Sequence, residues 1–141
     1  MTYSKTAQLG KKNMKPRSKK AKGSRLERNL AQKLRQSGLD SGASRMPLSG
    51  AFETLKSDIL TNLPVSFECK NQETWSPLPY MQQAKAGAKQ NEIPVVVMSK
   101  NRLPEPLCLI ELKDLIYLMQ LAKEGGWIKE LSYSKRKQIG K

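Results

Sequence analysis

The segment from Ser57 to Lys70 constrains the fold of this chain more than any other. It reads Ser-Asp-Ile-Leu-Thr-Asn-Leu-Pro-Val-Ser-Phe-Glu-Cys-Lys, with apolar and β-branched residues on both sides of an Asn-Leu-Pro breaker. This pattern predicts two short strands joined by a turn. Side chains alternate between the two faces of a strand, so the second strand places Glu68 and Lys70 together, opposite an apolar face.

Asp58 stands in the first of these strands, directly before an apolar pair. A hairpin or a neighbouring strand would bring its carboxylate close to Glu68. Two carboxylates beside Lys70 suit metal-dependent phosphodiester hydrolysis, because hard divalent cations prefer oxygen ligands and leave room for water and phosphate. A nearby lysine can position water or stabilise the transition state. A solvated polar face is the alternative that this fragment leaves open.

The charge of the chain points to a polyanionic partner. Lysine and arginine outnumber aspartate and glutamate by 26 to 12 over 141 residues, giving a formal charge of +14. Nucleic acid is the natural partner for such a chain, and an anionic membrane surface is the alternative. No apolar run approaches the length of a membrane span, and no apolar stretch follows the basic N-terminus. We therefore expect a soluble protein that is not exported.

The two cysteines, Cys69 and Cys108, each stand in an apolar run that resembles a strand. Small buried thiols of this kind are typical of a reducing compartment. The cysteines lack zinc-site spacing, and the absence of histidine excludes most zinc sites. A cytoplasmic location is expected, in the host cell if the protein is encoded by a virus.

The charge distribution divides the chain into three parts. Residues 1–22 contain eight basic and no acidic residues, which predicts a disordered basic arm that contacts DNA phosphates. A tail that only aids solubility is the alternative. Residues 23–126 are predicted to form the folded domain, and residues 127–141 a second basic tail.

The first helix is expected to begin at Ser24, with apolar residues at helical spacing, and to end at Gly38. Its exposed side carries Arg25 and Arg28. The run from Ser24 to Glu27 also fits a capping box, and this structural role is an alternative to catalysis for Glu27.

The remaining elements follow from periodicity and from breakers. A weak strand is expected over 39–44, then a loop over 45–52 that could place Arg45 or Ser49 on a phosphate. A helix over about 79–90 leads to strands over 94–98, buried on both faces, and over 107–111. A helix from about Leu112 to Lys123 carries an apolar stripe wider than one small sheet requires, so part of it is expected to serve a dimer interface.

Four motifs in this order resemble the PD-(D/E)XK nuclease superfamily, and most closely the archaeal-type Holliday junction resolvases and their virus-encoded relatives. The run Lys22–Arg28 is similar to their Lys-Gly-(Ser/Thr)-Arg-x-Glu-Arg, and Arg45–Gly50 to their Arg-Ser-Pro-x-Ser-Gly. Asp58-Ile59-Leu60 is similar to their Pro-Asp-Ile, with Ser57 in place of the proline. Glu68-Cys69-Lys70 matches their Glu-x-Lys.

The resemblance implies an α/β fold of the restriction-endonuclease type, a mixed β-sheet flanked by helices. It implies a Mg²⁺ or Mn²⁺ ion held by three residues, namely Asp58, Glu68 and, through its carbonyl, Cys69. It further implies that Lys70 serves the water and the transition state, that Glu27 completes the site, and that Ser49 contacts the scissile phosphate. DNA contacts are expected from four basic residues: Lys22, Arg25, Arg28 and Arg45.

The function expected from this resemblance is that of a metal-dependent endodeoxyribonuclease, a homodimeric Holliday junction resolvase that nicks branched DNA during recombination and repair. Two alternatives stay open. The same core could belong to another restriction-like or repair nuclease. The charge alone would also suit a non-catalytic basic protein that binds nucleic acid.

Overall fold

The computed structural model describes residues 16–47 and 57–126. Along the chain it contains α1 (Pro16–Gln36), β1 (Ser44–Arg45), β2 (Ile59–Leu60), β3 (Val65–Asn71), α2 (Pro77–Gly87), β4 (Ile93–Ser99), β5 (Leu107–Ile110) and α3 (Leu112–Glu124). No helix within these ranges is long and apolar enough to cross a membrane.

The main sheet has the strand order β3-β4-β5 and is mixed, as predicted. β3 and β4 run parallel with Val65 opposite Ile93, whereas β4 and β5 run antiparallel with Val97 opposite Cys108. Parallel neighbours need a crossover connection, and α2 supplies it. β1 and β2 form a separate antiparallel pair. β3 is therefore an edge of the main sheet.

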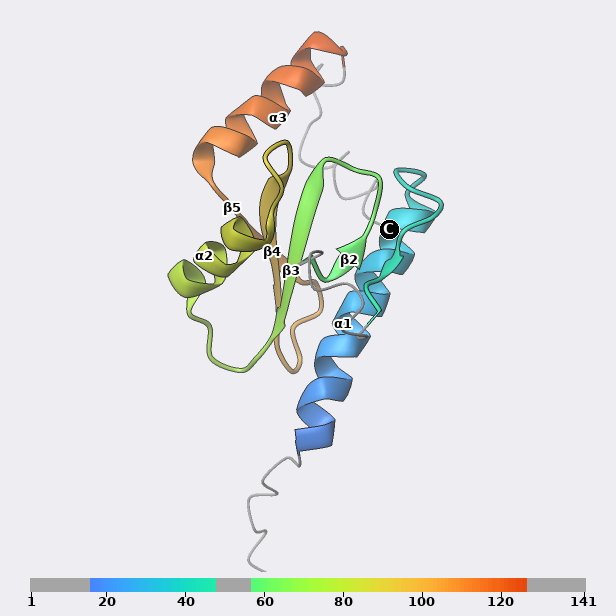
Figure 1. The fold of residues 1–141 in the computed structure, drawn as a ribbon, viewed down its shortest axis with the longest axis vertical. Coiled ribbons are helices and arrows are strands. Elements are labelled where there is room, and N and C mark those ends of the chain that lie inside the picture. The colour runs from blue at the N-terminus through green and yellow to red at the C-terminus, as the bar shows by residue number, and fades with distance from the viewer. Residues whose placement is uncertain (1–15, 48–56, 127–141) are drawn as a thin grey trace, which may run out of the picture.

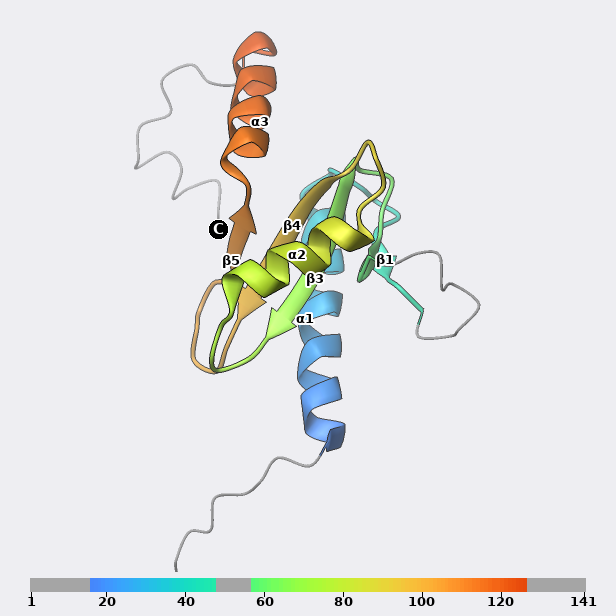
Figure 2. The ribbon, with the colours of Figure 1, turned by 60° about the vertical axis from the view of Figure 1, so that its left-hand side comes forward.

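Helices α1 and α2 cover opposite faces of this sheet (Figures 1 and 2). Leu26 and Leu34 of α1 pack with Phe67, Val95 and Val97 on one face. On the other face α2 contributes a second cluster, made by Tyr80, Met81, Ala84, Val96 and Met98. Alternate side chains of β4 thus belong to the two clusters, which confirms that this strand is buried on both faces.

The first helix begins at Pro16, so the prediction that it begins at Ser24 was wrong. Proline suits a helix start because it has no backbone N–H to leave unsatisfied. Residues 16–22, predicted as part of a disordered arm, are helical, and residues 1–15 lie outside the described residues. Ser24 lies inside the helix and cannot form the predicted capping box, which leaves Glu27 available for another role.

Other boundaries differ less. The weak strand predicted over 39–44 is reduced to the two residues of β1, because residues 37–43 form a turn held at the end of α1. The predicted loop after β1 lies largely outside the described residues, from 48 to 56. Both cysteines are free thiols, but only Cys69 is partly buried; Cys108 is exposed on β5, contrary to prediction.

α3 projects away from the sheet (Figures 1 and 2). None of its side chains is buried against the described part of the chain. Its large apolar side chains, Leu112, Leu115, Ile116, Tyr117, Leu118, Met119 and Leu121, are 39–69% exposed. The expectation that part of this stripe covers the sheet was therefore wrong for the residues described.

Asp40 is a buried carboxylate that joins two turns. It accepts hydrogen bonds from Thr61 Oγ1 at 2.6 Å, from the Asn62 N–H at 3.0 Å and from the Gly42 N–H at 2.9 Å. These bonds connect the turn after α1 to the turn between β2 and β3. In order of strength, the bonds from Thr61, Asn62 and Gly42 hold the pKa of Asp40 below its usual value.

Replacing Asp40 by alanine should lower the free energy of unfolding, since it removes all three bonds. A carboxylate with a lowered pKa stabilises the fold at neutral pH and loses this contribution as the pH falls below about 4. In urea unfolding, Asp40→Ala should therefore have a lower free energy of unfolding than the unmodified chain at pH 7. This difference should shrink toward pH 3. The exposed Glu124→Ala change is the control; an equal effect of both variants would contradict the account.

Candidate active site

The open edge of β3 carries the candidate site. The Asp58 N–H donates to the Phe67 carbonyl at 2.9 Å, and the Phe67 N–H donates to Ser57 Oγ at 3.2 Å. These bonds attach the start of β2 to β3 without a regular ladder. Ser57 stands where the resembling motif has proline, and its hydroxyl fixes this strand entry by hydrogen bonding.

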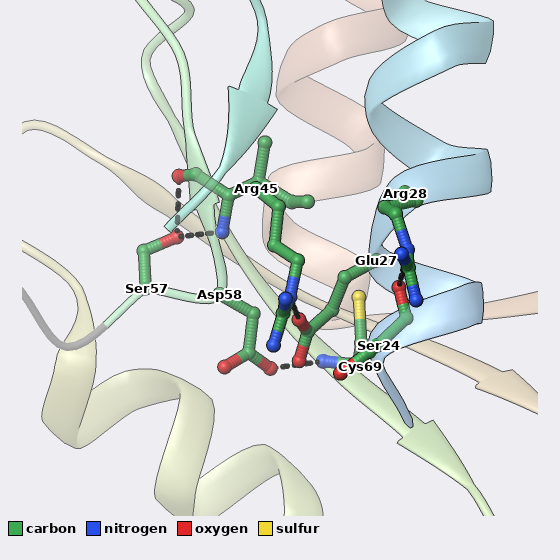
Figure 3. Close-up of polar contacts among 8 residues, drawn as sticks. Ser24, Glu27, Arg28, Arg45, Ser57, Asp58 and Cys69 are labelled. Atoms are coloured by element: carbon green, nitrogen blue, oxygen red, sulfur yellow. Dashed lines mark hydrogen bonds and ion pairs between the residues drawn. The ribbon is translucent and has the colours of Figure 1, made fainter. Parts of the chain in front are cut away.

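The Asp58 carboxylate is held by the backbone of Cys69, the next residue after Phe67 whose N–H points to this edge of β3. Its Oδ2 accepts a 2.7 Å hydrogen bond from the Cys69 N–H (Figure 3). The N–H and C=O of one strand residue point to the same side, so the Cys69 carbonyl also faces this edge. The Cys69 thiol instead packs against the α1 cluster. The backbone of Cys69, not its sulfur, belongs to the site.

Glu68 and Lys70 lie together on the α2 side of β3, as the strand alternation predicted. Lys70 Nζ is 3.2 Å from Glu68 Oε1 and donates to Gln83 Oε1 of α2 at 2.7 Å. The same ammonium lies 5.4 Å from the centroid of the Tyr80 ring, within cation–π range. Three partners from two elements thus hold the Lys70 ammonium in place.

Glu27 reaches the site from α1, where it forms an ion pair with Arg45 of β1. Figure 3 shows the Asp58 carboxylate beside this pair. Arg45 therefore neutralises Glu27, and the predicted contact of Arg45 with phosphate would require it to change partner. Glu27 is far from Asp58 in sequence, and the fold brings the two carboxylates together.

Two carboxyl groups of the site have raised pKa values. Burial raises the pKa of Asp58 to about 6, against the Cys69 N–H bond that lowers it; the charges of Glu68 and Glu27 raise it further. Burial also raises the pKa of Glu68, opposed mainly by Lys70 and aided by Glu27. When ionised, three carboxylates beside Lys70 and Arg45 leave one uncompensated negative charge, which a cation would relieve.

The donor set fits a hard divalent ion. Asp58 and Glu68 supply carboxylates and Cys69 a carbonyl, all oxygen ligands of the type that Mg²⁺ and Mn²⁺ prefer. Within the described residues, no three His, Cys, Asp or Glu side chains approach closely enough to hold a metal. Mg²⁺ does not need such a cage, since it keeps several waters and uses one or two carboxylates.

Three of the predicted DNA contacts lie on α1 and differ in their surroundings. Lys22 lines a cleft of about 570 Å³ with Gly23 and residues 69–74, directly beside Lys70. Arg25 is exposed on α1, and Arg28 is also exposed, with its Nε donating to the Ser24 carbonyl at 3.2 Å. Ser49 lies outside the described residues.

Gln83 contacts the site but was not among the residues predicted to form it. The structure places its amide oxygen on Lys70. No local signal distinguishes Gln83 from Gln82, because only the packing of α2 on β3 decides which glutamine faces the lysine. The role of Ser57 in fixing the strand entry was likewise not apparent from the sequence.

A comparison with protein families agrees with this geometry. The family described as "Phage putative PDDEXK endonuclease" matches residues 18–139. The chain belongs to this family. Searches of curated proteins and of solved structures find no match. The predicted PD-(D/E)XK superfamily and the restriction-endonuclease-like α/β fold are thereby confirmed.

Family membership makes the chain a nuclease with DNA as its substrate class, and nucleases of this superfamily generally use divalent metal ions. The match extends from residue 18 to residue 139, so it includes the last helical residues of the predicted arm and most of the predicted C-terminal tail. Bacteriophage origin, expected from the virus-encoded relatives, agrees with the family description.

Replacing Asp58 by asparagine should stabilise the metal-free protein at neutral pH. Because the folded pKa is about 6, the folded state holds a proton between pH 4 and 6 that the unfolded chain has released. Stability therefore falls as the pH rises through this window. The neutral amide of Asp58→Asn carries no such penalty, so the variant should gain on the order of 1–2 kcal/mol at pH 7.5.

Urea unfolding in EDTA at several pH values measures this difference. The gain should shrink as the pH falls to 4 and below, where Asp58 becomes protonated in both states. The exposed Glu124→Gln change is the control for loss of one negative charge. A variant that is less stable than the unmodified protein at pH 7.5 would contradict the assignment of a repulsive acidic site.

Proposed function

We propose that this nuclease is a Mg²⁺- or Mn²⁺-dependent endonuclease that nicks branched DNA as a Holliday junction resolvase. The observation that carries the proposal is that Asp58 accepts the Cys69 N–H at the edge of β3, near enough to Glu68 and Lys70 for their charges to act on its pKa. These are the residue types that phosphodiester hydrolysis needs, and they come from motifs in the order found in resolvases.

Asp58, Glu68 and the Cys69 carbonyl would hold the ion. When bound, the ion would supply an activated water and positive charge for the phosphate. The chain itself supplies a lysine held by Gln83 and Tyr80, so its ammonium needs little reorganisation to meet charge that develops on the phosphate. Preorganised charge of this kind is among the largest contributions to catalysis.

Glu27 is proposed to take part through water, since it lies close enough to raise the pKa of both Asp58 and Glu68. Arg45 holds it in position. We keep Ser49 as a proposed contact to the scissile phosphate. Arg45 and Arg28 stay proposed DNA contacts, as does the basic segment before α1.

Selection of branched DNA would rest on shape rather than on base sequence. The chain offers a high positive charge. Phosphate contacts of that kind position DNA without reading its bases. A two-fold dimer would match the symmetry of a four-way junction and place one site on each of two strands, as the likeness to resolvases suggests.

α3 supports the proposed homodimer. A helix of 13 residues is marginal by itself in water. One broad arc of α3 is apolar, with side chains at 112, 115, 116, 118, 119 and 122. The rest of the described chain does not cover this arc. We propose that a second copy of the chain covers this arc.

Placing a charge on that arc should therefore separate the subunits. Leu115→Glu together with Met119→Glu should convert a dimer to a monomer in sedimentation equilibrium, with unchanged helix content in the rest of the fold. Lys113→Glu with Gln120→Glu, on the opposite side of α3, is the control. Monomeric behaviour of the unmodified chain would contradict the dimer and leave the nuclease assignment in place.

Cleavage of branched DNA tests the proposed activity. An immobile four-way junction should receive paired nicks in Mg²⁺ or Mn²⁺ and none in chelator, while a linear duplex of the same sequence stays intact. Asp58→Asn should reduce the cleavage rate by at least about 100-fold, in the range seen when an electrostatic catalytic group is removed. Its DNA affinity should be kept or increased, because a negative charge near the phosphate is gone.

Each other outcome selects an alternative. Cutting of both substrates would favour a restriction-like or repair nuclease. Binding without cutting in either metal would favour a non-catalytic DNA-binding protein, and unchanged cleavage by Asp58→Asn would overturn the site.

A further inference from the structure

A second depression lies between α1 and the connection from β4 to β5. We call it the α1 groove. It has a volume of about 330 Å³, and five of its lining residues are basic: Lys22, Arg25, Lys33, Lys100 and Arg102. None of its lining residues is acidic. Lys33, Lys100 and Arg102 were not predicted to contact DNA.

The α1 groove adjoins the cleft that contains Lys70. Lys22 and Asn71 line both depressions, and the cleft also contains Lys70. The Asn71 side-chain amide donates to the Lys22 carbonyl at 3.2 Å, and Lys22 Nζ donates to Asn101 Oδ1 at 2.9 Å. These bonds fix the wall that the two depressions share, with Lys70 on one side of it and Arg102 on the other.

The shape of the basic row suits an extended polyanion. Lys22, Arg25, Asn29 and Lys33 recur at three- and four-residue spacing and therefore share one side of α1. From Lys22 to Lys33 the helix axis extends about 16 Å. One DNA strand rises about 3.4 Å per nucleotide, so the row matches roughly five nucleotides and exceeds a single phosphate.

The opposite wall is a turn that carries Lys100 and Arg102, and the Lys100 ammonium lies 5.2 Å from the centroid of the Trp75 ring. The Leu103 N–H donates to the Lys100 carbonyl at 3.2 Å, and Arg102 adopts a left-handed conformation with φ of 64°. The Asn101 N–H donates to Glu73 at 2.9 Å, which fixes the turn to the end of β3. Lys33 pairs with Glu105 at 3.1 Å, but both side chains are more than half exposed, so DNA can replace this partner.

We propose that the α1 groove binds about five nucleotides of DNA backbone on one side of the scissile phosphate, with Lys33, Lys100 and Arg102 as phosphate contacts. This inference rests on the proposed nuclease function, because it takes the strand in the groove to continue from the active site beside Lys70. The contacts position the DNA and carry no sequence preference.

The test compares DNA binding by two double variants of the full chain, in chelator so that no cutting occurs. Lys100→Gln with Arg102→Asn removes two groove charges, and asparagine tolerates the left-handed turn. Lys89→Gln with Lys123→Gln removes two exposed charges outside the groove. Circular dichroism and thermal melting check that both variants fold.

The groove variant should weaken binding to two unrelated duplex sequences equally. It should also reduce the slope of log affinity against log salt by about 1.8, since each phosphate contact contributes about 0.9. The control should change the slope much less. Equal slopes for the groove variant and the unmodified chain, or equal losses in both variants, would overturn the proposal.

The outcome for the groove is separable from that for catalysis. If the groove variant shows the expected slope change but the unmodified chain does not cut DNA in Mg²⁺ or Mn²⁺, the groove stands and the nuclease mechanism fails. If the unmodified chain cuts DNA and the groove variant binds and cuts equally well, the mechanism stands and the groove proposal fails.

Discussion

The site depends on one hydrogen bond, from the Cys69 N–H to Asp58 Oδ2, at the edge of β3 where the described residues add no further strand to the main sheet. An unpaired strand edge exposes backbone groups that need partners. Here the entry to β2 satisfies them, through the Phe67 contacts of Ser57 and Asp58. The same bonds that terminate the sheet therefore place a carboxylate beside the Glu68–Lys70 pair.

That placement has an energetic cost. Burial and mutual repulsion raise the pKa of Asp58 and of Glu68, so the acidic cluster is strained when both are ionised. Lys70 and Arg45 offset only part of the charge. Such conflict with stability is expected at functional sites, where local rules of folding are broken for chemistry. The surrounding sheet, packed by α1 and α2 on both faces, holds the arrangement.

The sequence sufficed for features that depend on local periodicity. The alternation of β3 predicted that Glu68 and Lys70 share a face, and the valine run predicted the buried β4. It could not show that Arg45 would pair with Glu27, or that Gln83 would reach Lys70, since tertiary packing decides both. Periodicity found the apolar stripe of α3 but not what covers it. The α1 groove could not be predicted, because its second wall is the β4–β5 turn, which is distant from α1 in the sequence.

The central claim is that Asp58 and Glu68 form a site for a divalent cation, and calorimetric titration with Mn²⁺ in the absence of DNA tests it most directly. Because the metal-free pKa of Asp58 is about 6, the ion competes with a proton, and affinity should be higher at pH 8 than at pH 5. Asp58→Asn and Glu68→Gln should each abolish most of the binding. Undetectable binding by the unmodified chain, or binding by either variant that equals that of the unmodified chain, would contradict the account.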